Sequence, residues 1–291
     1  MTLSIICLMA AYIVSAQQNE NIFSYHVGEY KITLLSEGQG SGNTEILIGA
    51  TQEMINDYTK DGSFPIATNA FLIQTPDKNI LIDTGYGKAL PNNLKSLGLD
   101  GNKIDAILLT HMHGDHIGGL LHEGEILFPN AFIYIPQPEY DYWMSDKEMN
   151  QLPENRRGGF LNARKVVEAY KEKIQLFEPH KAGDVYSPLL SGISPIAGYG
   201  HTPGHTLFEI ESKGEKILVW GDLTHAMAIQ MPYPKVAVTY DVNPELAIKY
   251  RLEILKYVTK NNIPIAGMHI TYPAMGQIVE LKNGYEFKPF Q

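Results

Sequence analysis

Three histidines and one aspartate lie within six residues, directly after an apolar run that ends at Leu109. They are His111, His113, Asp115 and His116. An extended His111-x-His113 pair directs both imidazoles to one side, because side chains at i and i+2 share a face. The other two follow at a turn that opens a helix, so all four groups converge. Imidazole and carboxylate are ligands of zinc and other divalent first-row ions, and the segment is therefore interpreted as a metal site rather than as ordinary packed histidines.

The composition excludes some kinds of metal site and some classes of protein. Cys7 is the single cysteine among 291 residues, which excludes an intramolecular disulfide and a thiolate zinc site of the finger type. Hydrophobic residues make up 44% of the chain and charged residues 19%, which is typical of a globular protein. The formal charge of −9 repels phosphate backbones, so nucleic acid is not expected as a partner.

Strands and helices must bring such groups together. Two halves, each with strands followed by helices, predict an α/β sandwich of two sheets covered by helices. The expected strands are 30–35, 69–75, 79–82, 106–109, 131–135, 206–210 and 216–219, and the expected helices are about 88–97, 160–173 and 244–260. Asn243 followed by Pro244 is a cap with proline at the first helical position, which predicts the start of the last helix.

The first residues are interpreted as a targeting segment. Residues 3–14 are apolar, and Val14-Ser15-Ala16 has the small-x-small form of a signal-peptidase site. No Lys or Arg precedes the apolar run, so a buried N-terminal element is the alternative. The apolar run is too short for a membrane span, so stable membrane insertion is not expected. Residues 1–16 are therefore predicted to be a secretory signal that exports the protein, and 17–291 a single domain.

The cluster at His111 resembles the signature of the metallo-β-lactamase superfamily, and further motifs of that family follow in order. His201 lies in Gly-His-Thr-Pro-Gly-His, Asp222 follows a glycine after an apolar strand, and His269 follows Gly-Met. Upstream, Leu-Ile-Asp-Thr-Gly around Asp83 matches the family's early strand and turn. The resemblance covers roughly residues 30–290.

This resemblance implies an αββα sandwich of two mixed β-sheets flanked by helices, with two metal ions, expected to be zinc. One ion would be held by His111, His113 and His201, the other by Asp115, His116 and His269, and Asp222 would bridge both together with a hydroxide. It also places Asp83 beside a ligand imidazole as a hydrogen-bond partner. His205 is expected to be a structural partner in its turn rather than a ligand.

A narrower resemblance lies in the C-terminal third. The segments 220–231, 236–241, 268–276 and 284–289 are similar to the methyl parathion hydrolase subgroup, which is related to N-acyl homoserine lactonases. Better-known lactonases carry a tyrosine three residues beyond the bridging aspartate, where this chain has His225. His225 is a candidate catalytic residue with Asp115 and Asp222, either as a hydrogen-bond donor to the substrate carbonyl or as a wall residue.

Residues near the motifs predict an apolar pocket wall. These are Phe64, Tyr86, Trp143, Met227 and Tyr272, with core packing as the alternative for each. The segment Ile46–Gly62 is either a lid over the site or ordinary packing.

Three functions are compatible with these sequence features. The first is a binuclear hydrolase in which metal-bound hydroxide cleaves a small-molecule lactone or carboxylic ester, for example an acyl homoserine lactone. The second is phosphotriester hydrolysis at the same site. The third is a non-catalytic metal- or ligand-binding module. A homodimer is compatible with each of them.

Overall fold

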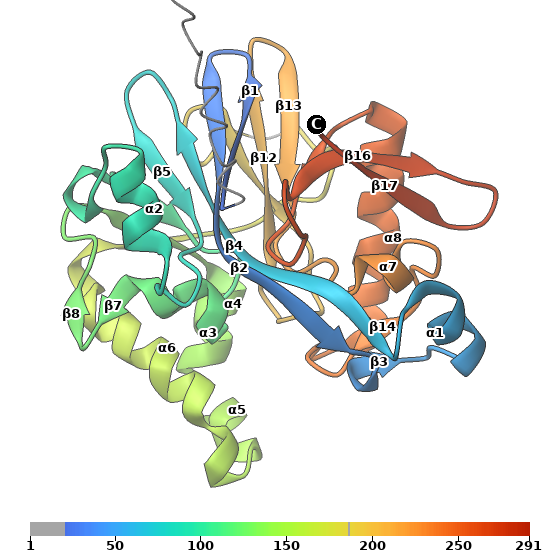
Figure 1. Cartoon of the computed structure of the whole chain (residues 1–291). Helices are drawn as coiled ribbons and strands as arrows, with labels where there is room; N and C mark the ends of the chain where they lie inside the picture. Colours follow the sequence, from blue (N-terminus) through green and yellow to red (C-terminus); the bar gives the residue numbers. More distant parts are fainter. Residues whose placement is uncertain (1–20, 186) are drawn as a thin grey trace, which may run out of the picture.

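Two mixed β-sheets form the centre of the computed structural model, which describes residues 21–185 and 187–291 (Figure 1). The first sheet has the strand order β1 (Ile22–Val27), β2 (Tyr30–Asn43), β4 (Ser63–Gln74), β5 (Asn79–Ile82), β6 (Ala106–Leu108), β9 (Phe132–Pro136) and β10 (Ile174–Phe177). The second has the order β11 (Ile193–Ala197), β12 (Thr206–Ser212), β13 (Glu215–Val219), β15 (Ile265–Ala266), β16 (Met275–Glu280) and β17 (Tyr285–Pro289). Both contain parallel and antiparallel pairs.

Alternation along the strands of the first sheet produces two separate cores. In β4, Phe71 and Ile73 join the core that also contains Phe208 and Ile217 of the second sheet. Leu72 between them joins the core on the opposite face of the first sheet. Because successive side chains of a strand point to opposite faces, a strand buried on both sides reads as a continuous apolar run.

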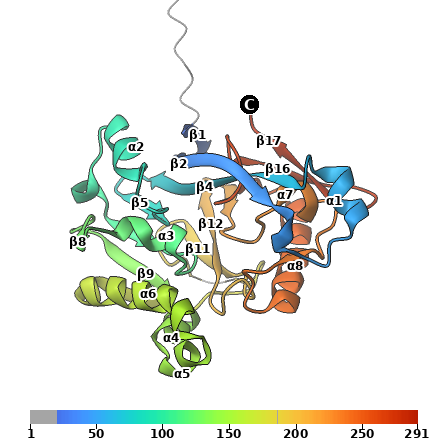
Figure 2. The same ribbon diagram turned by 60° about the horizontal axis from the view of Figure 1, so that its bottom comes forward.

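Helices cover the outer faces of the two sheets. The helices α2 (Leu90–Ser96), α4 (Gln137–Met144) and α6 (Gly158–Ala169) pack on the first sheet, and α8 (Pro244–Asn261) packs on the second (Figures 1 and 2). As the sequence predicts, the Asn243 side chain caps α8 by accepting from the Leu246 N–H. The predicted αββα sandwich of two mixed sheets flanked by helices is confirmed.

Most predicted elements are present, with shifted ends. The helix expected over 160–173 ends at Ala169 and is followed by a 3-10 turn, Lys171–Lys173. The strand expected over 30–35 continues to Asn43, and the strand expected over 69–75 begins at Ser63. The added halves of β2 and β4 form a ribbon that leaves the first sheet and crosses toward α1 (Gln52–Tyr58) in both views (Figures 1 and 2).

The remaining elements are short and mostly lie in the connections. They are β3 (Leu47–Ile48), β7 (Leu121–His122), β8 (Glu125–Ile126), β14 (Ala237–Val238), α3 (Gly114–Ile117), α5 (Asp146–Gln151), α7 (Met227–Gln230) and the 3-10 turns Thr44–Ile46, Gly101–Lys103, Gly118–Leu120 and Glu154–Arg156. Within the described ranges, no helix is long and apolar enough to cross a membrane. The predicted signal, residues 1–16, lies outside the described residues.

Candidate metal centre

The loops after four strands bring the predicted metal ligands to one place. His111 follows β6, Asp222 follows β13, and His269 follows β15, while His201 lies in the loop between β11 and β12. Strands β13 and β15 are parallel neighbours, so their carboxyl ends open at the same edge of the second sheet. The α3 helix carries Asp115 and His116 to the same edge from the first sheet.

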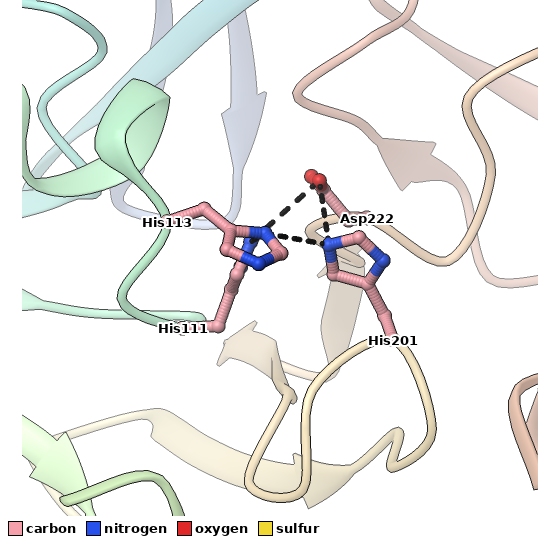
Figure 3. Close-up of side chains that lie close together, drawn as sticks. All are labelled: His111, His113, His201 and Asp222. Atoms are coloured by element: carbon pink, nitrogen blue, oxygen red, sulfur yellow. Dashed lines mark hydrogen bonds and ion pairs between the residues drawn. The ribbon is translucent and has the colours of Figure 1, made fainter. Parts of the chain in front are cut away.

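One group of donor atoms is formed by three imidazoles and a carboxylate (Figure 3). The Nδ1 atom of His113 lies 3.0 Å from Nε2 of His111 and 3.0 Å from Nε2 of His201. Asp222 Oδ2 lies 3.3 Å from Nε2 of His201 and 3.7 Å from Nε2 of His111. These four residues are the predicted first metal site.

A second group lies on the other side of Asp222. The carboxylate of Asp115 has its Oδ2 atom 3.7 Å from Nε2 of His116 and 3.6 Å from Nε2 of His269. The same two imidazoles approach Asp222, with His116 Nε2 at 3.2 Å from Oδ1 and His269 Nε2 at 3.0 Å from Oδ2. Asp222 therefore borders both groups, which is the position that the resemblance implies for a bridging ligand.

Two buried atoms between these groups lack the partners that buried polar atoms need. Asp222 Oδ1 and His116 Nε2 face each other and neither makes a hydrogen bond in acceptable geometry. A cation bound between them would satisfy both atoms. The donor set of imidazoles and carboxylates without thiolates fits divalent first-row metals, and the groups are consistent with a binuclear centre.

Asp83 orients one of these imidazoles, as the sequence predicts. Its Oδ2 atom lies 2.7 Å from Nδ1 of His116 and accepts a hydrogen bond of 2.6 Å from the Thr110 hydroxyl. Its Oδ1 atom accepts from the Thr110 N–H. A carboxylate at Nδ1 fixes the ring so that Nε2 points into the centre.

Two other imidazoles have orienting partners that the sequence analysis missed. Asp241 Oδ1 lies 3.0 Å from Nδ1 of His201, and the Ala67 carbonyl oxygen lies 2.8 Å from Nδ1 of His269. The Asp241 carboxylate is held in turn by the Val238 N–H. Asp241 ends the segment 236–241 that carries the narrower resemblance, and this was the available signal, but its contact with His201 bridges 40 residues of chain.

His205 has the structural role that the sequence predicts. Its Nδ1 donates to the Gly198 carbonyl oxygen at 2.8 Å, and its Nε2 accepts from the Asp222 N–H at 2.9 Å. Both ring nitrogens are thereby engaged, and the ring fixes the backbone of Asp222. Burial lowers the pKa of His205 to about 4, so the ring is neutral near pH 7.

A buried glutamate, also missed from sequence, ties the two histidine loops together. Glu139 of α4 accepts from the Met112 N–H at 2.9 Å, between the first two histidines, and from the Gly204 N–H at 2.9 Å. The indole N–H of Trp143 completes the set at 2.5 Å. Burial raises the pKa of Glu139, and these donors act in the opposite direction.

Burial sets the protonation state of the first group. It lowers the pKa values of His111 and His201 well below the ordinary range and that of His113 to about 4. The three rings are therefore neutral near pH 7, the form in which imidazole binds a metal.

Charge dominates at the bridging position. Burial would raise the pKa of Asp222, but His116 and His269 among other imidazoles outweigh it and hold the pKa well below its usual range. Burial would lower the pKa of His116, but the carboxylates of Asp222, Asp115 and Asp83 raise it well above its usual range. The carboxylate of Asp222 is therefore ionised near pH 7, and both its oxygens can bind a metal ion.

His225 lies within this centre. Its Nε2 is 3.0 Å from Asp222 Oδ2, its ring stacks on His269 with centroids 4.8 Å apart, and its Nδ1 is buried without a hydrogen bond. Gln230 holds the loop by accepting from the His225 N–H and the Ala226 N–H. His225 can therefore act either as a hydrogen-bonding group or as a further donor to the second metal group.

A cavity of about 730 Å³ opens over the two groups. Its lining residues are Glu37, Gly38, Gln39, Gly40, Ile66, Ala67, Thr68, Tyr86, Lys88, His113, Gly114, Asp115, His201, Asp222, His225, Tyr240 and His269. Of the five predicted wall residues, only Tyr86 is among them. No residue of the segment 46–62 lines the cavity.

The other four predicted wall residues do not line the cavity, although the Trp143 ring makes an edge contact with the ring of His113, 5.6 Å between centroids. Phe64 is buried against Gly42, and Trp143 packs on Phe160 at 4.7 Å between ring centroids. Tyr272 makes an edge contact with Phe23, and the Met227 sulfur accepts from the Thr224 hydroxyl. For these four residues the structure supports core packing, the alternative interpretation, because closeness to a motif along the chain does not fix the direction of a side chain.

The segment 46–62 is tied to its neighbours instead of covering the site. Its strand β3 pairs with β14, and Tyr58 at the end of α1 makes an edge contact with Tyr233. Ordinary packing is thus the better interpretation of this segment.

The comparison with known proteins agrees with the fold and with the candidate site. Residues 64–262 match the metallo-beta-lactamase superfamily, and the chain belongs to this superfamily. The two His/Asp groups described above are its candidate metal site.

Solved structures resemble nearly the whole chain. Hydrolase AbOPH, of the beta lactamase superfamily, has a TM-score of 0.83 at 28% identity, covering 94% of this chain and 99% of AbOPH. AidC, a dizinc quorum-quenching lactonase, has a TM-score of 0.80 at 26% identity, covering 93% of this chain and 98% of AidC.

Curated relatives match a smaller share of this chain. The acyl-coenzyme A thioesterase MBLAC2 of Gallus gallus is 29% identical over 184 residues, 58% of this chain and 62% of the relative. A probable metallo-hydrolase of Mycobacterium tuberculosis is 24% identical over 181 residues, 53% and 56% of the two chains. The chain thus spans less than two thirds of the length of these relatives.

Proposed function

We propose that the protein hydrolyses a lactone or carboxylic ester with two bound metal ions, zinc being the expected metal. The observation that carries this proposal is the position of the two His/Asp groups at one side of a cavity of about 730 Å³. This volume is within the range of small-molecule sites, and it leaves room for an ester with a sizeable acyl part.

The comparisons favour an acyl substrate. AidC is a dizinc lactonase bound to an acyl homoserine product, and MBLAC2 is an acyl-coenzyme A thioesterase. In both names the reacting group is an acyl carbonyl. These likenesses support an ester or lactone over a phosphotriester.

The residues of the chain supply the binding and positioning. His111, His113 and His201 would hold one ion, Asp115, His116 and His269 the other, with Asp222 shared. When bound, two such ions lower the pKa of a water and stabilise the oxyanion that develops at the carbonyl. His225 borders the cavity beside Asp222 and can donate a hydrogen bond toward that oxygen.

A panel of four substrates tests the proposal on protein loaded with zinc. We expect turnover of a lactone and an aryl ester, slower turnover of a methyl phosphotriester, and little turnover of a β-lactam. Metal analysis should find two equivalents per chain, and at most one after reconstitution would contradict the binuclear centre. A phosphotriester rate far above both acyl substrates would reverse the ranking, and no turnover at all would favour a binding module.

His225→Ala tests the role of the extra histidine. If His225 donates to the carbonyl oxygen, the rate should fall by roughly 10²–10³, the effect of losing one oxyanion donor. Metal content is measured on the same sample, because His225 also contacts Asp222. A near-normal rate with two metals retained would make His225 a wall residue.

A further inference from the structure

The cavity has two chemically different sides. One side carries the metal-binding groups, including Asp222, whose buried Oδ1 has no hydrogen-bond partner. The other side is the part of the β2–β4 ribbon that begins at the bulge after Ser36 and includes Gly38, Gly40 and Ile66. If the scissile bond lies at the first side, the rest of the substrate must lie against the second.

The ribbon presents glycines where side chains would otherwise fill this space. Gly38, Gly40 and Gly42 alternate along β2, so they share one face. Gly38 pairs with Thr68, Gly40 with Ile66 and Gly42 with Phe64. Partners in a cross-strand pair lie on the same side of the sheet, so half-buried Ile66 and Thr68 flank the two glycines that line the cavity.

The three glycines differ in what surrounds them. A methyl group added at Gly42 would collide with the ring of Phe64, which fills that end of the row. A methyl group added at Gly38 or Gly40 would meet no atom within 4 Å. The missing side chains at these two positions therefore keep that side of the cavity open.

We infer that the arm of the substrate remote from the scissile bond lies over Gly38 and Gly40, beside Ile66, and that these glycines determine the arm length that the enzyme accepts. This inference rests on the proposed function. It specifies the substrate class as an ester or lactone with an acyl arm of several carbons. The half-buried apolar side chain of Ile66 provides a surface on which such an arm would bury area.

Gly40→Leu is the variant that tests the inference. Gly38 has φ of 139°, which disfavours any side chain, whereas Gly40 is not in the left-handed region. The substrates are p-nitrophenyl acetate and p-nitrophenyl octanoate. We expect kcat/KM for the octanoate ester to fall at least about tenfold and that for the acetate ester to change less than about threefold, with Gly40→Ala between wild type and Gly40→Leu.

Binding of octanoate, followed by calorimetry, gives a readout that does not need activity. Gly40→Leu should weaken octanoate binding about tenfold and leave acetate binding unchanged. Gly158→Leu is the matched control, because Gly158 also has open space around it and lies at the start of α6, away from the cavity.

The outcomes separate this inference from the proposed function. An equal fall for both esters, no fall for either, or octanoate binding that is undetectable in wild type or unchanged in Gly40→Leu would overturn the role of the glycines. If wild type hydrolyses neither ester but hydrolyses the lactone, only the ester part of the proposed function fails, and if it hydrolyses none of the three, the proposed function fails. In both cases octanoate binding alone then decides whether an acyl arm occupies this face.

Discussion

At the scale of single residues, the centre depends on carboxylates that touch imidazoles rather than metal. Asp83 holds Nδ1 of His116, and Asp241 holds Nδ1 of His201. The two imidazoles belong to different donor groups. The same interaction therefore supports each metal position from a separate part of the chain.

This separation predicts distinct effects of two matched variants. Asp83→Asn should lower the affinity for one metal ion by roughly 10–100-fold, and Asp241→Asn should do the same for the other ion. Each variant loses the carboxylate that orients its histidine. Chelator competition should show one tightly bound metal ion per chain in each single variant and none in the double variant. Asp57→Asn, at an exposed position of α1, is the control. Two tight equivalents in the double variant would show that these carboxylates do not support the metals.

At the scale of elements, α4 connects the two loops that carry the first donor group. Its buried Glu139 accepts hydrogen bonds from backbone amides of both loops and from Trp143 of the same helix. The Gly204 backbone approaches so closely that an added methyl group would collide with Glu139. The helix thus fixes the distance between the loops of His113 and His201.

Removing this carboxylate should destabilise the fold and loosen the centre. Glu139→Ala leaves three buried donors without partners, and each such loss costs about 1–3 kcal/mol. We expect the free energy of unfolding in urea to fall by at least about 2 kcal/mol. Asp141→Ala, exposed on the same helix, should change it by less than about 0.5 kcal/mol. Equal stabilities of the two variants would refute the role of Glu139.

At the scale of the whole molecule, the donor groups join the two sheets. His111, His113 and His116 come from the first sheet side, while His201, Asp222 and His269 come from the second. Bound metal would therefore link both halves in the folded state only.

Metal removal should consequently lower the thermal midpoint. A ligand at 100 times its Kd adds about 2.7 kcal/mol of stability, which corresponds to about 4–5 °C for a chain of 291 residues. The measurement compares thermal unfolding with zinc and with chelator. The double variant His111→Ala/His269→Ala, which lacks a donor from each group, should show little difference. A wild-type midpoint insensitive to chelator would contradict metal binding at this interface.

The predicted signal segment is tested on the native protein. We propose export with cleavage after Ala16, because a small-x-small sequence ends the apolar run. Mass spectrometry of protein from its natural source should find an N-terminus at or near Gln17. Retention of Met1 in a cytosolic fraction would refute export.

The sequence by itself was enough to select the candidate donor residues, which the fold brings together, and to predict the class of fold. Local spacing was enough for His111 and His113, because two residues of extended chain fix their common direction. The capped helix beginning at Pro244 was also predictable, since its cap and its periodicity are local properties. The ordered motifs added the family and hence the sandwich.

Only the tertiary structure decided how the site is supported and bounded. Asp241 and Glu139 act across long stretches of chain, so local spacing does not identify their hydrogen-bond partners. The extension of β2 through Gly38, Gly40 and Gly42 was missed because glycine is unfavourable in strands, and pairing with β4 overrides that preference. The cavity wall is a further example: Phe64, Trp143 and Met227 lie in β4, α4 and α7, and which side of these elements faces the cavity depends on the tertiary packing, which the sequence does not state.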